Sequence, residues 1–273
     1  MNCRNLLIEG VTILYGAFWT ITPTYCENII IRDVKIMTEG EYGHTPNGDG
    51  INPSSCKDVL IESCFFDTGD DCIAIKSGRD RDGIKTGQPT ENVVIRYCRG
   101  HRGHGGIVIG SEMSGGIRNI YAHDCTFHGT DRALRIKVAR ERGGYVQNLW
   151  FRNITADRIT HEAIRINMQY TADGFSGKRK GDQPPRLSNF HFANISCAFA
   201  EGNAIKIDGL HDQPVTDLHF ENINLTGTKG IEIADARNIT FSDLHLRVKQ
   251  GPVFKMDRTE GVKFEGTAEI TIL

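Results

Sequence analysis

The sequence predicts an all-β fold, a parallel β-helix (solenoid) of roughly ten coils that forms a single domain over residues 1–273. Two short patterns that recur along the chain predict it. The composition agrees, because 30 glycines against 8 prolines and many short apolar runs favour strands and tight turns. No stretch keeps a helical period beyond a turn or two, so long helices are not expected.

The first pattern is an Asx residue followed at once by an alternating apolar run, as at Asn28 in ENIIIRDVKI. It returns at intervals of roughly 20 to 40 residues, which is the spacing of solenoid repeats with loops of varying length. We expect one coil for each occurrence. The occurrences are Asn5, Asn28, Asp58, Asn92, Asn119, Asn148, Asn189, Asp217 and Asn238.

The second pattern is a small residue, an apolar residue, a variable residue and another apolar residue. The strand period of two turns the apolar positions to one side and the variable position to the other. Stacked coils then bury the apolar positions in columns and pair each strand in parallel with its counterpart about 4.8 Å away. The pattern occurs at residues 72–75, 106–109, 133–136, 163–166, 204–207 and 230–233.

Two other folds explain the repeats less well. A β-sandwich needs hairpin turns at regular intervals, and the sequence does not have them. A leucine-rich repeat needs a spacing of Leu and Asn that these repeats do not match. The stretch GKRKGDQPP, residues 177–185, indicates an exposed loop rather than a linker between domains.

The cysteines fall at repeated positions of the coils. Three stand two residues before the Asx residue of their coil, and three others stand six residues after it. This placement favours stacked free thiols, although an even number of cysteines also permits a disulfide framework. The first group is Cys3, Cys26 and Cys56, and the second is Cys64, Cys98 and Cys125.

The charge pattern narrows the classes of partner. A formal net charge of −2 argues against nucleic acid or an anionic membrane as the partner, since such binders carry a basic excess. No run of about 18 apolar residues would span a bilayer. The first residues, MNCRNLLIEG, lack the basic, apolar and small-residue segments that follow one another in a signal peptide.

Aligning the coils on the second pattern gathers charged residues into one patch. The alignment places Asp49 on Asp71 and His104 on Asp70, each pair about one strand spacing apart. Arg135 and the nearby Lys137 project outward one or two coils away. Three carboxylates this close cannot all ionise freely, so we expect one to hold its proton near neutral pH, as a general acid beside a general base requires.

Each of these residues also has a plain explanation. Asp49 in NGDG and the pair Asp70 and Asp71 are typical turn formers, and the cations are typical of a solvated strand face. The acidic residues alone would also suit calcium, but the neighbouring histidine and cations would repel it. Their convergence on one patch favours a functional site without a metal.

At these residues the sequence resembles glycoside hydrolase family 28, the polygalacturonases and their relatives. Four motifs match the family's motifs in order: residues 47–50 (NGDG), 69–71 (GDD), 103–105 (GHG) and 135–137 (RIK). The resemblance covers most of the chain. It implies a right-handed parallel β-helix that hydrolyses α-1,4-linked galacturonic acid in pectin with inversion, and it requires no cofactor.

The resemblance also implies roles for the site residues. Asp70 would protonate the glycosidic oxygen, His104 would tune that proton, and Asp49 and Asp71 would hold and deprotonate the attacking water. In an inverting site the acid and base stand about 6.5–9.5 Å apart. The residues expected to contact the galacturonan substrate are Arg135, Lys137, Tyr170 and Asn47.

The chain departs from the family pattern in two places. Gly48 replaces the usual threonine, and the N-terminal cap and first coils of the family are missing, which predicts end-to-end association through an uncapped coil. Full-length relatives are secreted or periplasmic. The insertion between Ser77 and Glu91 is expected to close one end of the cleft, which favours exo action.

Three alternatives remain open at this point. A rhamnogalacturonan or xylogalacturonan hydrolase of the same family would share the aspartates. A carbohydrate-binding β-helix would keep the fold without the activity. A polysaccharide lyase on a similar helix would need calcium or a basic catalytic residue.

Overall fold

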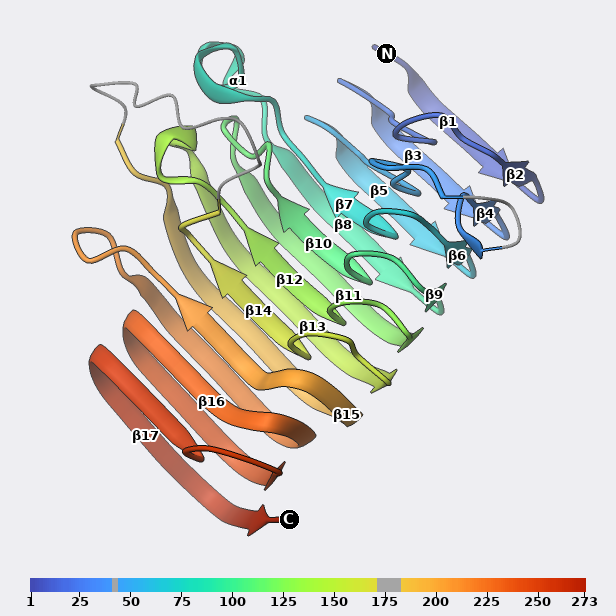
Figure 1. The fold of residues 1–273 in the computed structure, drawn as a ribbon. Coiled ribbons are helices and arrows are strands. Elements are labelled where there is room, and N and C mark those ends of the chain that lie inside the picture. Colours follow the sequence, from blue (N-terminus) through green and yellow to red (C-terminus); the bar gives the residue numbers. More distant parts are fainter. Residues whose placement is uncertain (41–43, 171–182) are drawn as a thin grey trace.

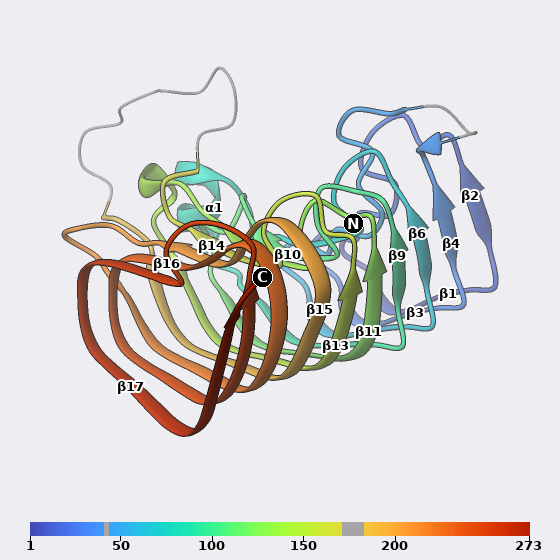
Figure 2. The ribbon, with the colours of Figure 1, turned by 60° about the horizontal axis from the view of Figure 1, so that its bottom comes forward.

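The computed structural model describes residues 1–40, 44–170 and 183–273. The chain winds as a right-handed parallel β-helix, as predicted, and the coils stack from the N-terminus at one end to the C-terminus at the other (Figure 1). Figure 2 shows the coils one behind another, with β17 at one end and β2 at the other. Almost all of the described regular structure is strand.

The strands make parallel ladders between successive coils, so that β1 pairs with β3, β3 with β5 and β5 with β8. A second ladder joins β2, β4, β6 and β9, and a third joins β7, β10, β12 and β14. In the later coils one long strand runs around the corners. The strands are β1 (Arg4–Glu9), β2 (Thr12–Leu14), β3 (Glu27–Arg32), β4 (Lys35–Met37), β5 (Lys57–Glu62), β6 (Phe65–Asp67), β7 (Ile73–Ile75), β8 (Thr90–Arg96), β9 (Arg99–His101), β10 (Ile107–Gly110), β11 (Ile117–His128), β12 (Leu134–Lys137), β13 (Tyr145–Asp157), β14 (Ile164–Asn167), β15 (Arg186–Asp208), β16 (Val215–Val248) and β17 (Phe254–Ile272).

The recurring Asx residues form one corner of the helix. Asn119 has a left-handed backbone, with φ of 57°, a conformation that Asn and Asp tolerate better than most residues. Its side-chain amide donates to Asn92 at 3.1 Å and its oxygen accepts from Asn148 at 3.1 Å. We call this column of stacked Asx side chains the amide ladder. Its other hydrogen bonds include Asn28 to Asn5, Asn92 to Asp58, Asn189 to Asn148 and Asn238 to Asp217.

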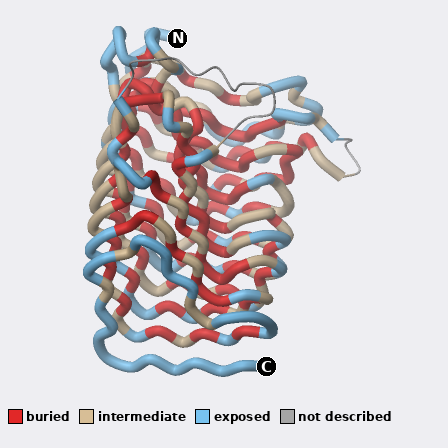
Figure 3. Tube along the Cα trace, turned by 60° about the vertical axis from the view of Figure 1, so that its left-hand side comes forward, coloured by how far each residue is buried: buried red, intermediate tan, exposed pale blue. Residues whose placement is uncertain are grey.

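The core consists of stacked columns of like side chains. Ile73, Ile107 and Leu134 occupy one column of the second pattern and are fully buried. Phe192 and Phe220 stack with ring centroids 4.8 Å apart in another. Burial falls off at both ends of the stack, where Leu7 and Ile272 are exposed (Figure 3).

The cysteines are all free, and all but Cys3 are buried. The register of β1, β3 and β5 places Cys3, Cys26 and Cys56 above one another. Cys64, Cys98 and Cys125 form the second column, where the Cys98 thiol interacts with both of its neighbours. The prediction of stacked thiols is confirmed.

Two short helical segments stand outside the coils. The insertion between Ser77 and Glu91 contains α1 (Asp80–Thr86), and η2 (Arg140–Arg142) follows β12. Arg142 Nη1 donates to Asp80 Oδ1 at 2.8 Å and joins the two segments. Of the predicted loop at residues 177–185, residues 177–182 lie outside the described part of the chain.

Candidate active site

Connections between strands carry the predicted carboxylates. Asp49 lies between β4 and β5, and Asp70 with Asp71 lies between β6 and β7. The bridge between Ile51 and Ile73 places these connections in adjacent coils. The predicted register is therefore confirmed.

The third ladder brings Arg135 and Lys137 close to the carboxylates. Val108 pairs with Ala74 on one side and with Arg135 on the other. Gly110 pairs with Lys137, so this lysine stands two coils from the position of Lys76. The alignment of the second pattern thus predicts the true stacking order.

Two glycines allow the carboxylate connections to approach closely. The amide of Gly50 donates to the carbonyl of Asp71 at 2.9 Å, and a Cβ on Gly50 would lie 2.4 Å from the carbonyl oxygen of Cys72. Gly103 has φ of +121°, and a Cβ there would lie 2.7 Å from the carbonyl oxygen of Asp70. A side chain at either position would push the coils apart at the site.

Asp49 is almost fully buried. Its Oδ2 accepts a hydrogen bond of 3.0 Å from Asn52 and lies 3.7 Å from Lys76 Nζ. Burial, followed by the negative charge of Asp71, raises the pKa of Asp49 to about 7, although Lys76 acts in the opposite direction. The expectation that one carboxyl keeps its proton near neutral pH is met by Asp49.

Asp70 faces His104 and is the most open of the three carboxylates, with 16% of its side chain exposed. His104 Nδ1 lies 3.1 Å from Asp70 Oδ1, and the Asp71 amide donates to the same oxygen at 2.8 Å. Burial acts to raise the pKa of Asp70, but the hydrogen bond with His104 and the charge of Lys137 outweigh it and bring the pKa to about 2. The hydrogen bond with Asp70 raises the pKa of His104 in turn.

Asp71 is fully buried between cations. Lys137 Nζ donates to Asp71 Oδ2 at 2.6 Å, and Arg135 Nη1 lies 3.7 Å from Asp71 Oδ1. Within the described residues, Oδ1 receives no hydrogen bond. This oxygen is therefore available as an acceptor for a group that enters the site.

The three carboxylates are closer together than expected. One oxygen of each lies within 4.8 Å of the others, which is shorter than the separation of about 6.5–9.5 Å between the two carboxyl groups of an inverting pair. The spacing alone would suit a cation. The ammonium groups of Lys76 and Lys137 lie 3.7 Å from Asp49 and 2.6 Å from Asp71 and would repel a cation, which disfavours a metal here.

Three of the four predicted substrate-contacting residues lie together, and the fourth, Asn47, has no contact with them that the structure shows. The guanidinium of Arg135 and the ammonium of Lys137 lie 5.5 and 5.4 Å from the ring centroid of Tyr170, so these three residues are grouped. Lys137 already donates to Asp71, which makes Arg135 the more available cation. Asn47 is exposed, and its side chain makes no hydrogen bond with any described residue.

The sequence does not predict the residues that surround Asp49. Lys76 Nζ donates to Glu112 Oε2 at 2.9 Å and stands 4.3 Å over the ring of Trp19. The alignment of Lys76 with Lys137 was a usable signal, because it places a second cation beside the carboxylates. Trp19 and Glu112 have no such signal, since loops outside the repeat carry them.

Fold and site together define the class: a parallel β-helix that carries a cluster of three carboxylates flanked by cations. The chain belongs to glycosyl hydrolases family 28, because the model of that family matches residues 1–244. A probable polygalacturonase of Vitis vinifera is 38% identical over 228 residues, which cover 82% of this chain and 45% of the relative. An exo-poly-alpha-D-galacturonosidase of Dickeya chrysanthemi is 28% identical and covers 88% of this chain and 41% of the relative.

Solved structures show the same relationship. A hyperthermoactive exopolygalacturonase from Thermotoga maritima is 36% identical with a TM-score of 0.73, over 97% of this chain and 54% of that one. A family 28 exopolygalacturonase of Yersinia enterocolitica shares the fold with a TM-score of 0.86 at 24% identity, over 97% of this chain and 46% of that one.

The chain spans about half the length of the curated relatives it matches, since it covers 45% and 41% of the two named above. Among the described residues, no helix is both long enough and apolar enough to cross a membrane.

Proposed function

We propose that this chain is the catalytic part of a hydrolase that cleaves α-1,4-linked galacturonic acid, as a polygalacturonase that acts from the chain end. The observation that carries the proposal is the close cluster of Asp49, Asp70 and Asp71, in which burial and hydrogen bonding push the pKa values of Asp49 and Asp70 apart. Such divergence leaves one carboxyl protonated and another ionised in the free chain, as acid and base work requires, and Asp70 can act as the acid only if it gains a proton when the substrate binds. The relatives named exopolygalacturonase support the exo action.

The acid role falls to Asp70 together with His104. Asp70 is the most open of the three carboxylates, so it is the one that a glycosidic oxygen reaches. Asp70 is ionised in the free chain, but the proton of His104 stands beside it. A bound substrate removes Asp70 from water, which favours the neutral carboxyl and draws this proton onto Asp70 and then onto the leaving oxygen.

The water role falls to Asp49 and Asp71. Lys137 donates to Oδ2 of Asp71, and Oδ1 of Asp71 is the acceptor that can hold the attacking water. As the glycosidic bond breaks, the water oxygen bonds to the anomeric carbon and one water proton passes to this carboxylate pair. Arg135 and Tyr170 lie beside the pair and would bind the uronate carboxylate, for which a guanidinium suits a two-pronged grip.

The test is the release of reducing ends from polygalacturonate by the purified chain, with the products sized. We expect monomer or dimer, and a loss of about 10²- to 10⁴-fold in the Asp70→Asn variant, the usual contribution of a general acid. Proton NMR of the first product reports its anomeric configuration, and we expect the inversion that the family resemblance implies, although the nearest carboxylate oxygens lie within 4.8 Å of one another. Mixed oligomers would overturn exo action, and a retained anomer would overturn inversion.

A parallel digestion of rhamnogalacturonan separates the substrates within the family. Cleavage of that polymer with none of polygalacturonate would overturn the choice of substrate but keep the hydrolase. Binding of polygalacturonate by a folded sample without any cleavage would overturn the hydrolase itself.

A further inference from the structure

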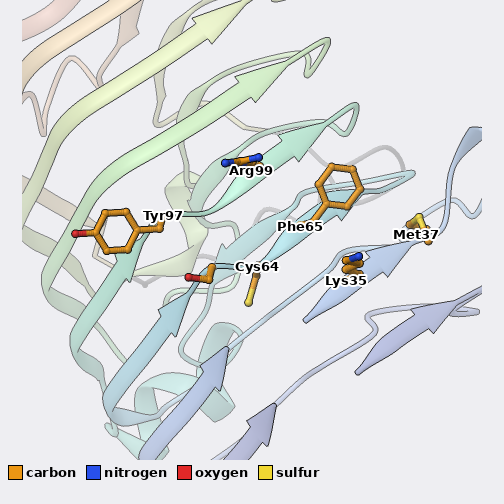
Figure 4. A pocket seen from close by; sticks show the side chains of 7 residues that line it. Lys35, Met37, Cys64, Phe65, Tyr97 and Arg99 are labelled. Carbon is orange, nitrogen blue, oxygen red and sulfur yellow. The ribbon is translucent and has the colours of Figure 1, made fainter. Parts of the chain in front are cut away.

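A groove outside the candidate active site lies on the outer face of the second ladder, which contains β4, β6 and β9. Its volume is about 540 Å³, and Figure 4 shows its lining side chains on neighbouring strands. None of the proposed catalytic or substrate-contacting residues lines it. We call it the outer groove, lined by Lys35, Met37, Ser63, Cys64, Phe65, Tyr97 and Arg99.

The pairing of β4, β6 and β9 aligns three of these side chains in one row. Lys35 pairs with Phe65, and Phe65 pairs with Arg99, so they form one outward column with an aromatic ring between two cations. Successive coils are about 4.8 Å apart, which places the two cations about 10 Å apart. The column runs along the stack, perpendicular to the strands.

The two cations are uncommitted. Neither Lys35 nor Arg99 has an ion-pair partner among the residues that the structure describes, and both are exposed. Their neighbours differ, because Arg96 pairs with Glu62 at 2.7 Å and Arg102 pairs with Asp67. Unpaired cations beside an aromatic ring favour a ligand that carries both negative charge and an apolar surface.

The groove continues along the stack. A second hollow of about 260 Å³ shares Phe65 and Arg99 with it. This hollow adds His101 and His128, whose rings stack with centroids 5.2 Å apart. The combined surface is a track several coils long, which suits an extended chain rather than a compact ligand.

We propose that the outer groove binds a strand of polygalacturonate as a secondary site, remote from the cleavage site. Lys35 and Arg99 would each bind the carboxylate of a different sugar, and the C–H face of the sugar between them would pack on Phe65. The choice of this polyanion rests on the proposed function. A second site would hold the enzyme on the polymer and raise the effective concentration of chain ends.

The test is affinity electrophoresis of the Asp70→Asn chain in gels that contain polygalacturonate, so that the polymer is not consumed. Replacing Lys35 and Arg99 with serine should weaken the retardation about three- to tenfold, since each removes an exposed charge contact. The matched control replaces Arg152 in β13 and Lys263 in β17 with serine, which removes the same charge away from the outer groove. Equal retardation of the two double variants would overturn the proposal.

A second pair of variants separates ring contact from charge. Phe65→Ser should weaken the retardation, and Phe65→Tyr, which keeps the ring, should restore it, with thermal unfolding confirming that each variant is folded. Retardation that survives Phe65→Ser overturns the stacking role. Equal dependence on Lys35 and Arg99 in gels that contain single-stranded DNA would overturn the choice of a uronan.

Cleavage of a galacturonate trimer distinguishes failure of the groove from failure of the proposed function. The trimer is too short to occupy both sites. The double variant Lys35→Ser with Arg99→Ser, made in the chain that keeps Asp70, should therefore cleave the trimer at the natural rate. If the natural chain cleaves neither trimer nor polymer, the proposed function fails, and the gel comparison still decides the groove.

Discussion

Two columns of Asx side chains follow the same stacking rule with opposite results. In the amide ladder, Asn92, Asn119 and Asn148 each donate to one neighbour and accept from another, at 2.8–3.1 Å. In the site, Asp49 and Asp71 stack in adjacent coils as well, but a carboxylate has only acceptors to offer. The ladder satisfies itself, whereas the aspartates depend on buried lysines.

The perturbed carboxyl of the site results from the same stacking that stabilises the amides. Stacking like on like is favourable for amides because each is both donor and acceptor. The same geometry forces like charges together when the amide is replaced by a carboxylate, and one carboxyl then holds a proton to about pH 7. Four substitutions break or sharpen this contrast.

The largest effect is expected from Lys137→Met. It leaves the fully buried Asp71 without its 2.6 Å partner and with only Arg135, at 3.7 Å, beside it, and breaking a buried ion pair destabilises a fold by about 3–5 kcal/mol. Urea denaturation at pH 7 measures the loss, with Lys137→Arg as the charge-preserving control. A loss below about 1 kcal/mol would mean that Asp71 does not need the lysine.

Asp49→Asn should make the protein more stable above neutral pH. The pKa of Asp49 is raised from 3.8 to about 7 in the fold, so the folded state binds the proton more tightly than the unfolded state does. Stability is therefore full below about pH 4 and falls as the pH rises to about 7, by about 4 kcal/mol at 1.36 kcal/mol for each pH unit.

The asparagine variant lacks this ionisation and should lose that slope. Denaturation at pH 4 and pH 8 should show the two proteins converging at low pH and the variant ahead at high pH, while hydrolysis by the variant is lost. Parallel slopes for the two proteins would show that Asp49 ionises as readily in the fold as in the unfolded chain.

Asn119→Ala tests the neutral column. Alanine in the left-handed conformation of Asn119, φ 57°, costs about 1–2 kcal/mol. Asn119→Gly relieves the backbone cost and isolates the lost amide hydrogen bonds. Both variants should keep full hydrolytic activity, and a fall in activity without unfolding would link the ladder to the site.

Lys76→Met should have the smallest effect, a rise of about one unit in the pKa of Asp49. The positive charge of Lys76 lowers that pKa in the natural chain, and its removal leaves only Lys137 to oppose burial and the charge of Asp71. Carbon-13 NMR titration of the aspartate carboxyls measures the shift, and Lys76→Arg should keep the natural value. An unchanged or lower pKa in Lys76→Met would contradict the assigned direction.

Much of the fold could be predicted because the same residue types recur at the same point of each coil. Asn28 and Asn92 mark a corner that needs a left-handed residue, and the isoleucines of residues 72–75 and 106–109 mark a buried column. The repeat also aligned Asp49 with Asp71, since the register of one coil fixes that of the next.

The features that the sequence did not predict lie in loops outside the repeat or depend on opposing effects on the pKa of each carboxyl. Trp19 and Glu112 reach the site from loops, whose paths no period defines. The protonated carboxyl is Asp49 rather than Asp70, because that outcome depends on which carboxylate meets His104 and which meets only Asn52 and a more distant lysine.

The burial of the thiols makes this chain suitable for a chemical probe of local opening. Cys3 is exposed, while burial raises the pKa of Cys56 to about 11 and that of Cys72 to about 12. The thiolate is the form that reacts with alkylating reagents, so a maleimide should label Cys3 at once and the fully buried Cys72 only slowly. Slow labelling of Cys72 would then report, in time, how often the coil that carries Asp70 and Asp71 comes apart.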